Sequence, residues 1–116
     1  MNWIVPAEVV RVMDGDTVVV RADLGWRVQL ETSVRIDGIN APESNTPEGQ
    51  ESKKFAQALL QKRDKVTIVS KRLLGATEKY GRTLADLTYG YPPVSFAEAM
   101  VKAGHAKPWD GLGEPP

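Results

Sequence analysis

The sequence predicts a mainly β domain with two α-helices, in which five strands form a small barrel. Three observations support this fold class. Two valine-rich segments near the start are separated by a turn signal, a longer segment then alternates apolar and polar residues, and two segments with helical spacing follow at separate places. The length of 116 residues, of which 41% are hydrophobic, fits one domain over residues 1–116.

The first two strands are predicted over Ala7–Met13 and Thr17–Asp23, which flank the turn sequence Asp14-Gly15-Asp16. The third is predicted over Trp26–Ile36, where apolar and polar residues alternate. We expect one face of this strand to build the core, and its residues are Trp26, Val28, Leu30, Val34 and Ile36. Arg35 belongs to the other face and should point away from the core.

A helix should follow, because Thr46 is a suitable N-cap and Pro47 suits the first helical position. Its core side recurs at helical spacing and consists of Ser52, Phe55, Ala56, Leu59 and Leu60. Lys65–Ser70 and Thr83–Tyr89 are predicted as the fourth and fifth strands, joined by a basic loop at Lys71–Gly81.

The second helix begins at a capping box formed by Ser95 and Glu98 and ends at Gly104. Its predicted apolar face consists of Phe96, Ala99, Met100 and Ala103. The last segment, Pro108–Pro116, is rich in proline and glycine and should be irregular, which leaves a core of about residues 7–107. Three strands, a helix, two strands and a helix suggest a five-stranded barrel of the OB type.

Composition excludes several kinds of site. There is no cysteine, which excludes disulfides and thiolate metal sites, and one histidine, His105, which excludes sites with two histidines. The 15 basic and 15 acidic residues balance, which disfavours tight non-specific binding of nucleic acid but leaves room for a local basic cleft. We see neither a membrane span nor a signal peptide, and expect a monomer that is cytoplasmic as written or secreted if this is a processed form.

Three short segments carry groups suited to phosphate chemistry: Asp14–Thr17, Arg35–Glu43 and Glu78–Arg82. They supply carboxylates and an amide oxygen, which are ligands that Ca²⁺ and Mg²⁺ prefer. They also supply two arginines, which bind phosphate through charge-assisted hydrogen bonds. Phosphodiester cleavage needs an activated water and neutralisation of the charge that develops on phosphoryl oxygens.

In this order, the three segments resemble those of the staphylococcal-nuclease-like (thermonuclease) family, which carries DGDT, R-x4-D-x-P-E and KYGR motifs. The resemblance extends from about Ala7 to about Lys107. It implies an OB barrel with flanking helices and an endonuclease that hydrolyses DNA or RNA, single-stranded or transiently open, with Ca²⁺ (Mg²⁺ or another divalent ion being an alternative). The implied products end in a 3′-phosphate. Little chain follows Gly104, so we expect the family's third helix to be absent.

For the metal, the resemblance implies that Asp16 is a direct ligand and that Asp14 supports it from the second shell. Asn40 occupies the place of a second aspartate ligand, and Ala41 would offer its backbone carbonyl. An amide in place of a carboxylate removes one negative charge, so metal affinity should be lower than in the family. Asp37 either compensates for this loss or pairs with a basic neighbour.

For the substrate, the resemblance implies that Arg35 and Arg82 bind the scissile phosphate and that Glu43 positions or deprotonates the attacking water. Lys79 and Tyr80 would contact a neighbouring phosphate and nucleoside. Trp109 lies near a position where the family carries an aromatic residue that stacks on a base. It could equally cover the bottom of the barrel.

Two other functions remain open. The chain could be a nuclease-like OB domain that only binds nucleic acid or protein, which Asn40 and the zero net charge favour. Joint retention of Asp16, Arg35, Glu43 and Arg82 argues against it. It could also be a small protein-interaction barrel without a nucleic-acid role.

Overall fold

The structure, a computed structural model, describes residues 3–70 and 82–109. Its elements in chain order are β1 (Trp3–Asp14), β2 (Thr17–Asp23), β3 (Gln29–Ile36), β4 (Ile39–Asn40), α1 (Pro47–Leu59), β5 (Lys65–Ser70), β6 (Thr83–Tyr89), β7 (Val94–Ser95), α2 (Phe96–Lys102) and β8 (Lys107–Pro108). The predicted loop at Lys71–Gly81 and most of the predicted tail lie outside the described residues.

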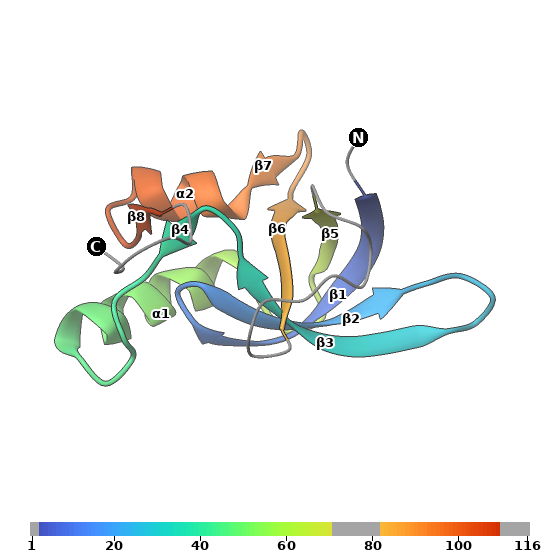
Figure 1. Cartoon of the computed structure of the whole chain (residues 1–116), viewed down its shortest axis with the longest axis horizontal. Helices are drawn as coiled ribbons and strands as arrows, with labels where there is room; N and C mark the ends of the chain where they lie inside the picture. Colours follow the sequence, from blue (N-terminus) through green and yellow to red (C-terminus); the bar gives the residue numbers. More distant parts are fainter. Residues whose placement is uncertain (1–2, 71–81, 110–116) are drawn as a thin grey trace.

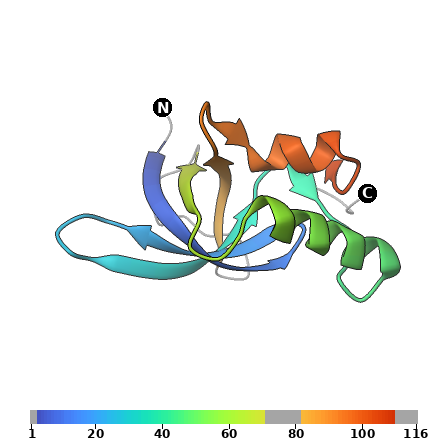
Figure 2. The same ribbon diagram turned by 180° about the vertical axis from the view of Figure 1, so that it is seen from behind.

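Five strands close into a barrel in the order β3-β2-β1-β5-β6 (Figures 1 and 2). Neighbouring strands are antiparallel, and closure comes from a short parallel pairing of β3 with β6 at Val34↔Thr83, Arg35↔Leu84 and Ile36↔Ala85. β7 pairs antiparallel with β6 at the edge of the sheet, while β4 and β8 form a separate two-stranded pair. This confirms the predicted mainly β fold with a five-stranded OB-type barrel and two helices.

The barrel interior is filled mainly by branched side chains, and both helices contribute to the same core. The largest fully buried side chains include Val18, Val20, Val34, Ile36, Leu60, Leu87, Phe96 and Met100. Burial of this apolar surface is the main source of stability for a barrel of this size. In the described part of the chain, neither helix has the length and apolar character needed to cross a membrane.

Helix α1 packs closely against the turn between β1 and β2. A Cβ atom placed on Gly15 would lie 1.9 Å from Ser52 Oγ, so only glycine permits this approach. Ser52 is fully buried, and its hydroxyl donates to the carbonyl of His105 beyond α2, at 2.8 Å. The turn, α1 and the end of α2 are therefore packed as one unit.

Both predicted helix starts are confirmed. Thr46 Oγ1 accepts a hydrogen bond from the Gly49 N–H at 3.0 Å, and Ser95 Oγ accepts one from the Glu98 N–H at 3.1 Å. At the end of α2, Gly104 has a φ of +81°, and its N–H donates to Val101 O, as expected for a Schellman cap. The predicted apolar face of α2 is wrong at one position, because Ala103 is the exposed C-cap residue.

The prediction for the third strand is wrong in its first part. The strand begins at Gln29, and Trp26 lies in the turn before it. Val34 and Ile36 are buried as predicted, but Trp26, Val28 and Leu30 are 97%, 50% and 52% exposed. The reason is that the β2–β3 hairpin extends beyond the barrel, at the right of Figure 1, so these side chains lie outside the described core.

The first strand is also longer than predicted. It begins at Trp3 instead of Ala7, because its first residues pair with β5 from Trp3↔Ser70 to Glu8↔Lys65. A long-range pairing of this kind leaves no local signal in the sequence.

Candidate functional site

Three segments that are distant in sequence meet at one end of the closing strand pair. Thr17, at the start of β2, lies opposite Arg35 in β3, and Val34 beside it pairs with Thr83 at the start of β6. Arg82 directly precedes β6 and is therefore brought to the same place. Barrel closure thus unites the β1–β2 turn, the end of β3 and the start of β6.

The Asp16 carboxylate contacts three surrounding residues, Thr17, Arg35 and Ala41. Its Oδ2 atom accepts the backbone N–H of Ala41 at 2.9 Å and lies 3.5 Å from Nη2 of Arg35. Its Oδ1 atom accepts the Thr17 hydroxyl at 3.2 Å. The side chain is only 13% exposed, so the β1–β2 turn presents this carboxylate inside the site, where solvent screens it weakly.

Arg35 is buried although it does not belong to the barrel core. It alternates with Val34 and Ile36, as predicted, yet the face to which it points is itself covered. Its Nη1 atom donates to the carbonyl of Ile36 at 2.8 Å, and Nη2 donates to Asn40 Oδ1 at 3.4 Å. These contacts, with the ion pair to Asp16, hold the guanidinium in one orientation.

Arg82 approaches the same carboxylate through a threonine. Its Nη1 atom lies 3.5 Å from the Thr17 hydroxyl, which in turn donates to Asp16. Thr17 is therefore the residue that sequence reasoning left without a role, although it belongs to the DGDT motif. The result is a cluster in which two guanidinium groups, Arg35 and Arg82, are arranged about one carboxylate.

Asp14 stabilises the β1–β2 turn through a hydrogen bond to its backbone. Its Oδ1 atom accepts the backbone N–H of Asp16 at 3.2 Å. Burial raises the pKa of the Asp14 carboxyl to about 6, and both the hydrogen bond with the Asp16 side chain and the negative charge of Asp16 act in the same direction. A nearby cation would oppose this effect by favouring the charged form.

The site offers a carboxylate oxygen and an amide oxygen, which are donor types that a hard divalent cation prefers. Arg35 Nη2 lies 3.5 Å from Asp16 Oδ2 and 3.4 Å from Asn40 Oδ1, so a positive charge is already close to both oxygens. The hydrogen bond from Ala41 places that residue at the same carboxylate. Over residues 3–70 and 82–109, no group of three or more His, Cys, Asp or Glu side chains is suited to a metal. Amide and backbone oxygens would therefore complete any coordination shell.

Asp37 does not form the ion pair with a basic neighbour that was one of its two predicted arrangements, among the residues that the structure describes. Its backbone N–H donates to Ala85 O at 2.9 Å, but its carboxylate forms no ion pair with the described residues. Its role toward a metal stays a prediction.

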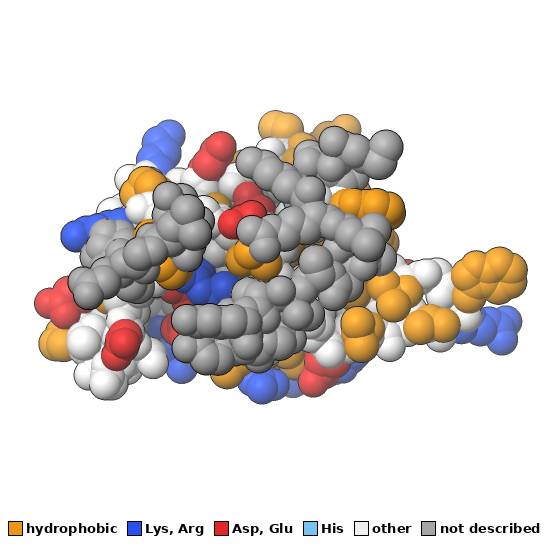
Figure 3. Space-filling model, in the orientation of Figure 1, with side chains coloured by type: hydrophobic (Ala, Val, Ile, Leu, Met, Phe, Trp, Pro, Cys, Tyr) orange, Lys and Arg blue, Asp and Glu red, His pale blue; other side chains and the backbone are white. Residues whose placement is uncertain are grey.

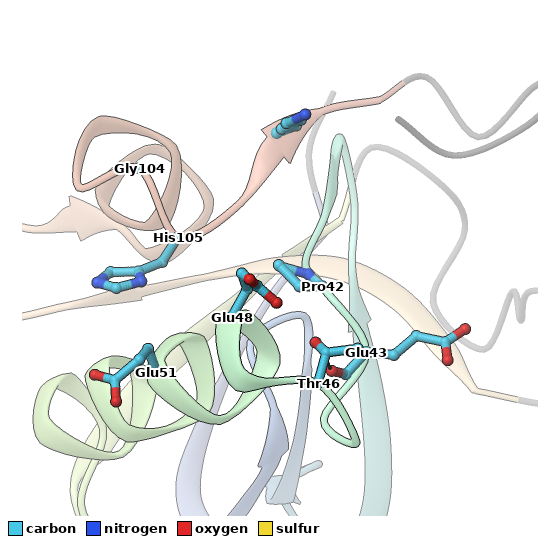
Figure 4. Close-up of a pocket in the computed structure, with 8 residues that line it drawn as sticks. Pro42, Glu43, Thr46, Glu48, Glu51, Gly104 and His105 are labelled. Carbon is cyan, nitrogen blue, oxygen red and sulfur yellow. Dashed lines mark hydrogen bonds between the residues drawn. The ribbon is translucent and has the colours of Figure 1, made fainter.

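Glu43 lies on the loop that leads from β4 into α1. Its carbonyl accepts the N–H and the hydroxyl of Thr46, at 3.0 and 2.7 Å, which fixes its backbone to the start of the helix. The side chain is exposed, and Figure 4 shows its carboxylate directed away from α1. The loop borders a groove of about 650 Å³ whose lining includes Glu48, Glu51, His105 and Lys107. The Glu43 carboxylate thus remains available to solvent.

Trp109 lies against Arg35, whose Cζ atom is 5.7 Å from the centre of the indole ring. Its backbone N–H donates to Gly38 O at 2.9 Å. The half-buried ring therefore borders the arginine site, and its possible use as a stacking surface for a base stays a prediction. Lys79 and Tyr80 lie outside the described residues.

His105 packs against helix α1. Its ring lies 4.7 Å from the ring of Phe55 on α1, measured between centroids. Together with the bond from Ser52 to its carbonyl, this contact ties the end of α2 to α1.

Comparison with known proteins agrees with this arrangement. A family model described as staphylococcal nuclease homologue matches residues 33–110, which is more than half of the chain. The match includes Arg35, Asn40, Glu43 and Arg82, whereas the β1–β2 turn with Asp16 precedes it. Among curated protein sequences, no match to the chain was found. On the family match and the barrel together, the chain belongs to the family of staphylococcal nuclease homologues.

Proposed function

We propose that the protein is a metal-dependent endonuclease that hydrolyses phosphodiester bonds in DNA or RNA. The observation that carries the proposal is the convergence of Arg35 and Arg82 on the Asp16–Thr17 pair. The loop after β4 adds an exposed carboxylate, that of Glu43. Membership of a nuclease-like family supports the same reaction class.

The two arginines would bind the scissile phosphate. Attack by water adds negative charge to the phosphoryl oxygens, and guanidinium groups stabilise that charge through paired hydrogen bonds. Arg35 is held by Ile36 O and by the indole of Trp109, so it needs little reorganisation when the phosphate arrives. Preorganisation of this kind is what makes an electrostatic group effective in catalysis.

Glu43 would hold the attacking water and accept its proton. The backbone of Glu43 is held at the N-terminus of α1 by its hydrogen bonds to Thr46, while its exposed side chain is free to orient a water molecule. General-base assistance contributes about 10²- to 10⁴-fold to a rate. The departing group is the 5′-oxygen, which leaves a 3′-phosphate on the other product.

Asp16, Asn40 and the backbone carbonyl of Ala41 would hold the ion, with Asp14 in support. A bound Ca²⁺ or similar ion supplies a Lewis acid that polarises a phosphoryl oxygen. Its charge would also favour the ionised forms of Asp14 and Asp16. Since Asn40 contributes no charge, we propose that this ion is bound more weakly than an all-carboxylate site would bind it.

The substrate we propose is single-stranded nucleic acid, read without sequence specificity. The contacts envisaged are to phosphate, from Arg35, Arg82 and Lys79, and to bases by stacking on Trp109 or Tyr80. A formal net charge of zero predicts modest affinity that falls with salt.

The decisive experiment is to incubate the pure protein with single-stranded DNA and RNA in Ca²⁺, in Mg²⁺ and in chelator, and then to identify the product ends. We expect cleavage that requires a divalent ion and leaves 3′-phosphates. Glu43→Gln and Arg35→Lys should each lower kcat by about 10²-fold or more.

The matched control is Glu48→Gln, which removes an exposed carboxylate from the same groove without touching the arginine cluster. It should keep activity within about threefold of the parent. Equal cleavage with and without chelator would rule out the metal-dependent mechanism, and equal losses in Glu43→Gln and Glu48→Gln would remove the special role of Glu43.

A second function, binding without turnover, is favoured by two contacts of Arg35. Arg35 donates to Asn40 and pairs with Asp16, so both groups that would otherwise bind the ion are engaged with an arginine. Salt-dependent binding of oligonucleotides without cleavage at saturating Ca²⁺ would decide for this alternative.

A further inference from the structure

Thr17 carries a buried hydroxyl at a position where an apolar side chain of the same shape would fit. It begins β2, three valines follow it, and its own side chain is 3% exposed. Valine has nearly the shape of threonine and the same preference for strands, so the strand would accept valine here. A buried hydroxyl lowers stability unless it is hydrogen-bonded. Its hydrogen-bond partners therefore indicate its role.

The Thr17 hydroxyl connects a carboxylate to a guanidinium group. It donates to Asp16 Oδ1 at 3.2 Å, and Arg82 Nη1 donates to it at 3.5 Å. A hydroxyl has one proton and two lone pairs, so it can donate to an acceptor and accept from a donor at the same time. A valine side chain could do neither. The connection between Asp16 and Arg82 through this atom thus depends on the hydroxyl and not on the shape of the side chain.

The same hydroxyl limits the rotation of the Asp16 carboxylate. The backbone of Asp16 is already fixed, because its carbonyl accepts the Ile36 N–H at 2.8 Å. Of the two side-chain oxygens, Oδ2 accepts the Ala41 N–H at 2.9 Å, and Oδ1 accepts the Thr17 hydroxyl. Donors on both oxygens define the plane of a carboxylate better than a donor on one oxygen does. Thr17 therefore supplies the hydrogen bond that fixes Oδ1.

The two arginines reach this carboxylate by different routes. Arg35 Nη2 lies 3.5 Å from Asp16 Oδ2 in a direct ion pair, and Arg35 Nη1 is held by Ile36 O. Arg82 reaches Asp16 Oδ1 through the Thr17 hydroxyl. Thr17 also lies directly opposite Arg35 in the β2–β3 ladder. Thr17 therefore adjoins both arginines, and its hydroxyl acts on the one that the direct ion pair does not include.

The placement of these two arginines matters because the surface offers a polyanion little general attraction. The formal net charge of the chain is zero. On the face seen in Figure 3, the basic and acidic side chains of the described residues are interspersed and form no broad basic surface. Non-specific attraction to nucleic acid increases with the number of phosphates that basic side chains neutralise. Cleavage should therefore depend on a few correctly oriented guanidinium groups.

We propose that Thr17 is a positioning residue for the cleavage reaction, whose hydroxyl orients the Arg82 guanidinium relative to Asp16. The proposal rests on the proposed nuclease function and extends it to a residue that would not touch the substrate. A guanidinium group that is oriented before the phosphate arrives needs no reorganisation as negative charge develops in the transition state. Loss of the hydroxyl should therefore lower kcat more than it raises KM.

Steady-state cleavage of single-stranded DNA with Ca²⁺ tests this through two variants of one position. Thr17→Val keeps the branched shape without the hydroxyl, and it should lower kcat about 10- to 30-fold while KM changes less than about threefold. Thr17→Ser keeps the hydroxyl, and its kcat should stay within about threefold of the parent. Stability should follow the opposite order, because serine lacks a buried methyl group. The urea midpoint of Thr17→Val should lie within about 0.5 M of the parent, and that of Thr17→Ser should be lower.

The matched control is Thr32→Val, which removes another threonine hydroxyl from the barrel. Thr32 Oγ1 lies 2.9 Å from Thr83 Oγ1, so this hydrogen bond joins β3 to the residue that follows Arg82. It could affect Arg82 only through the backbone at the start of β6. The control should keep kcat within about threefold of the parent. A loss equal to that of Thr17→Val would mean that strand pairing, and not the Thr17 hydroxyl, positions Arg82.

A measurement without substrate or metal separates this proposal from the nuclease function. In chelator, NMR exchange experiments on arginine side chains give the rate at which each guanidinium group rotates about its Nε–Cζ bond. A hydrogen bond from Nη1 slows this rotation, so Thr17→Val should speed it at least about fivefold at Arg82. At Arg35, whose Nη1 is held by Ile36 O, the rate should change less than about twofold. Absence of cleavage by the parent with every ion would refute the nuclease function, and the rotation rates would still test whether Thr17 orients Arg82.

Three results would overturn the proposal. One is a Thr17→Val variant that cleaves as fast as the parent. Another is an equal loss of kcat in Thr17→Val and Thr17→Ser, which would assign the effect to packing instead of to the hydroxyl. The third is an Arg82 guanidinium that rotates at the same rate in Thr17→Val and in the parent, whatever the activity of either protein.

Discussion

Replacing Asn40 with aspartate should tighten Ca²⁺ binding. The amide oxygen of Asn40 lies 3.4 Å from Arg35 Nη2, and Asp16 Oδ2 lies 3.5 Å from the same atom, so the substitution adds a charge where the proposed ion would bind. The new carboxylate is attracted both to the divalent ion and to Arg35. Because the ion has twice the charge of the guanidinium, the attraction to the ion is the stronger of the two.

The magnitude follows from Coulomb's law. With about 5 Å between charge centres, a carboxylate and a divalent ion attract by roughly 2 kcal/mol in a water-like medium and about 7 kcal/mol at an effective dielectric constant near 20. The competing attraction between the carboxylate and the singly charged Arg35, taken at the same separation, is half of each value. The net gain is roughly 1–3 kcal/mol, which corresponds to about 5- to 100-fold tighter binding.

Isothermal titration calorimetry with Ca²⁺ and no substrate measures this affinity without reference to activity. The control is Asn45→Asp, which adds the same charge at an exposed position of the loop before α1. It should change the dissociation constant by less than about threefold. If Asn40→Asp and Asn45→Asp have the same effect, or neither changes the affinity, then Asn40 is not at the ion site.

Three other outcomes are expected. The pKa of Asp14 is raised to about 6, so ionisation of this carboxyl should lower the free energy of unfolding of the metal-free protein progressively above pH 4. Asp14→Asn should therefore raise the free energy of unfolding by about 1–2 kcal/mol at pH 7.5 in chelator and leave it unchanged near pH 4, as measured by urea unfolding. A Cβ on Gly49 would lie 1.7 Å from Glu43 O, so Gly49→Ala should cost about 3 kcal/mol of stability and displace the Glu43 loop, whereas an unchanged unfolding midpoint would contradict the packing. Trp109→Ala should lower kcat for single-stranded DNA about three- to tenfold by releasing Arg35, and Trp109→Phe should restore most of it; equal rates in both variants would contradict this positioning role.

The parts of the fold that local sequence determines were predicted well. Thr46 and Ser95 mark the helix starts because capping chemistry depends on a few adjacent residues. The end of α2 at Gly104 follows from the same local logic.

The parts that depend on distant pairing were not predicted. The two-residue strands β4 and β8 exist only because Ile39 and Asn40 pair with Pro108 and Lys107. The alternation in β3 correctly assigned faces, but it could not indicate where the barrel ends, so Leu30 was assigned to the core. Periodicity reports which residues share a face, and burial depends on what covers that face.

The candidate site shows the same division. The motifs identified Asp16, Arg35 and Arg82, but their mutual contacts depend on strand register, which a single sequence does not reveal. The burial of Arg35 and the bridging position of Thr17 therefore became apparent only in the folded chain.

The close approach of Gly15 to Ser52 has a consequence for how this region opens. Because α1 leaves no space beside the β1–β2 turn, the turn cannot separate from the barrel until the helix undocks, and the helix is in turn bonded to His105. The amide of Ala41, whose hydrogen is held by Asp16, should then exchange with solvent only when the whole domain opens. Its protection from hydrogen exchange should equal that of the most protected core amides, and Gly15→Ala should abolish this equality.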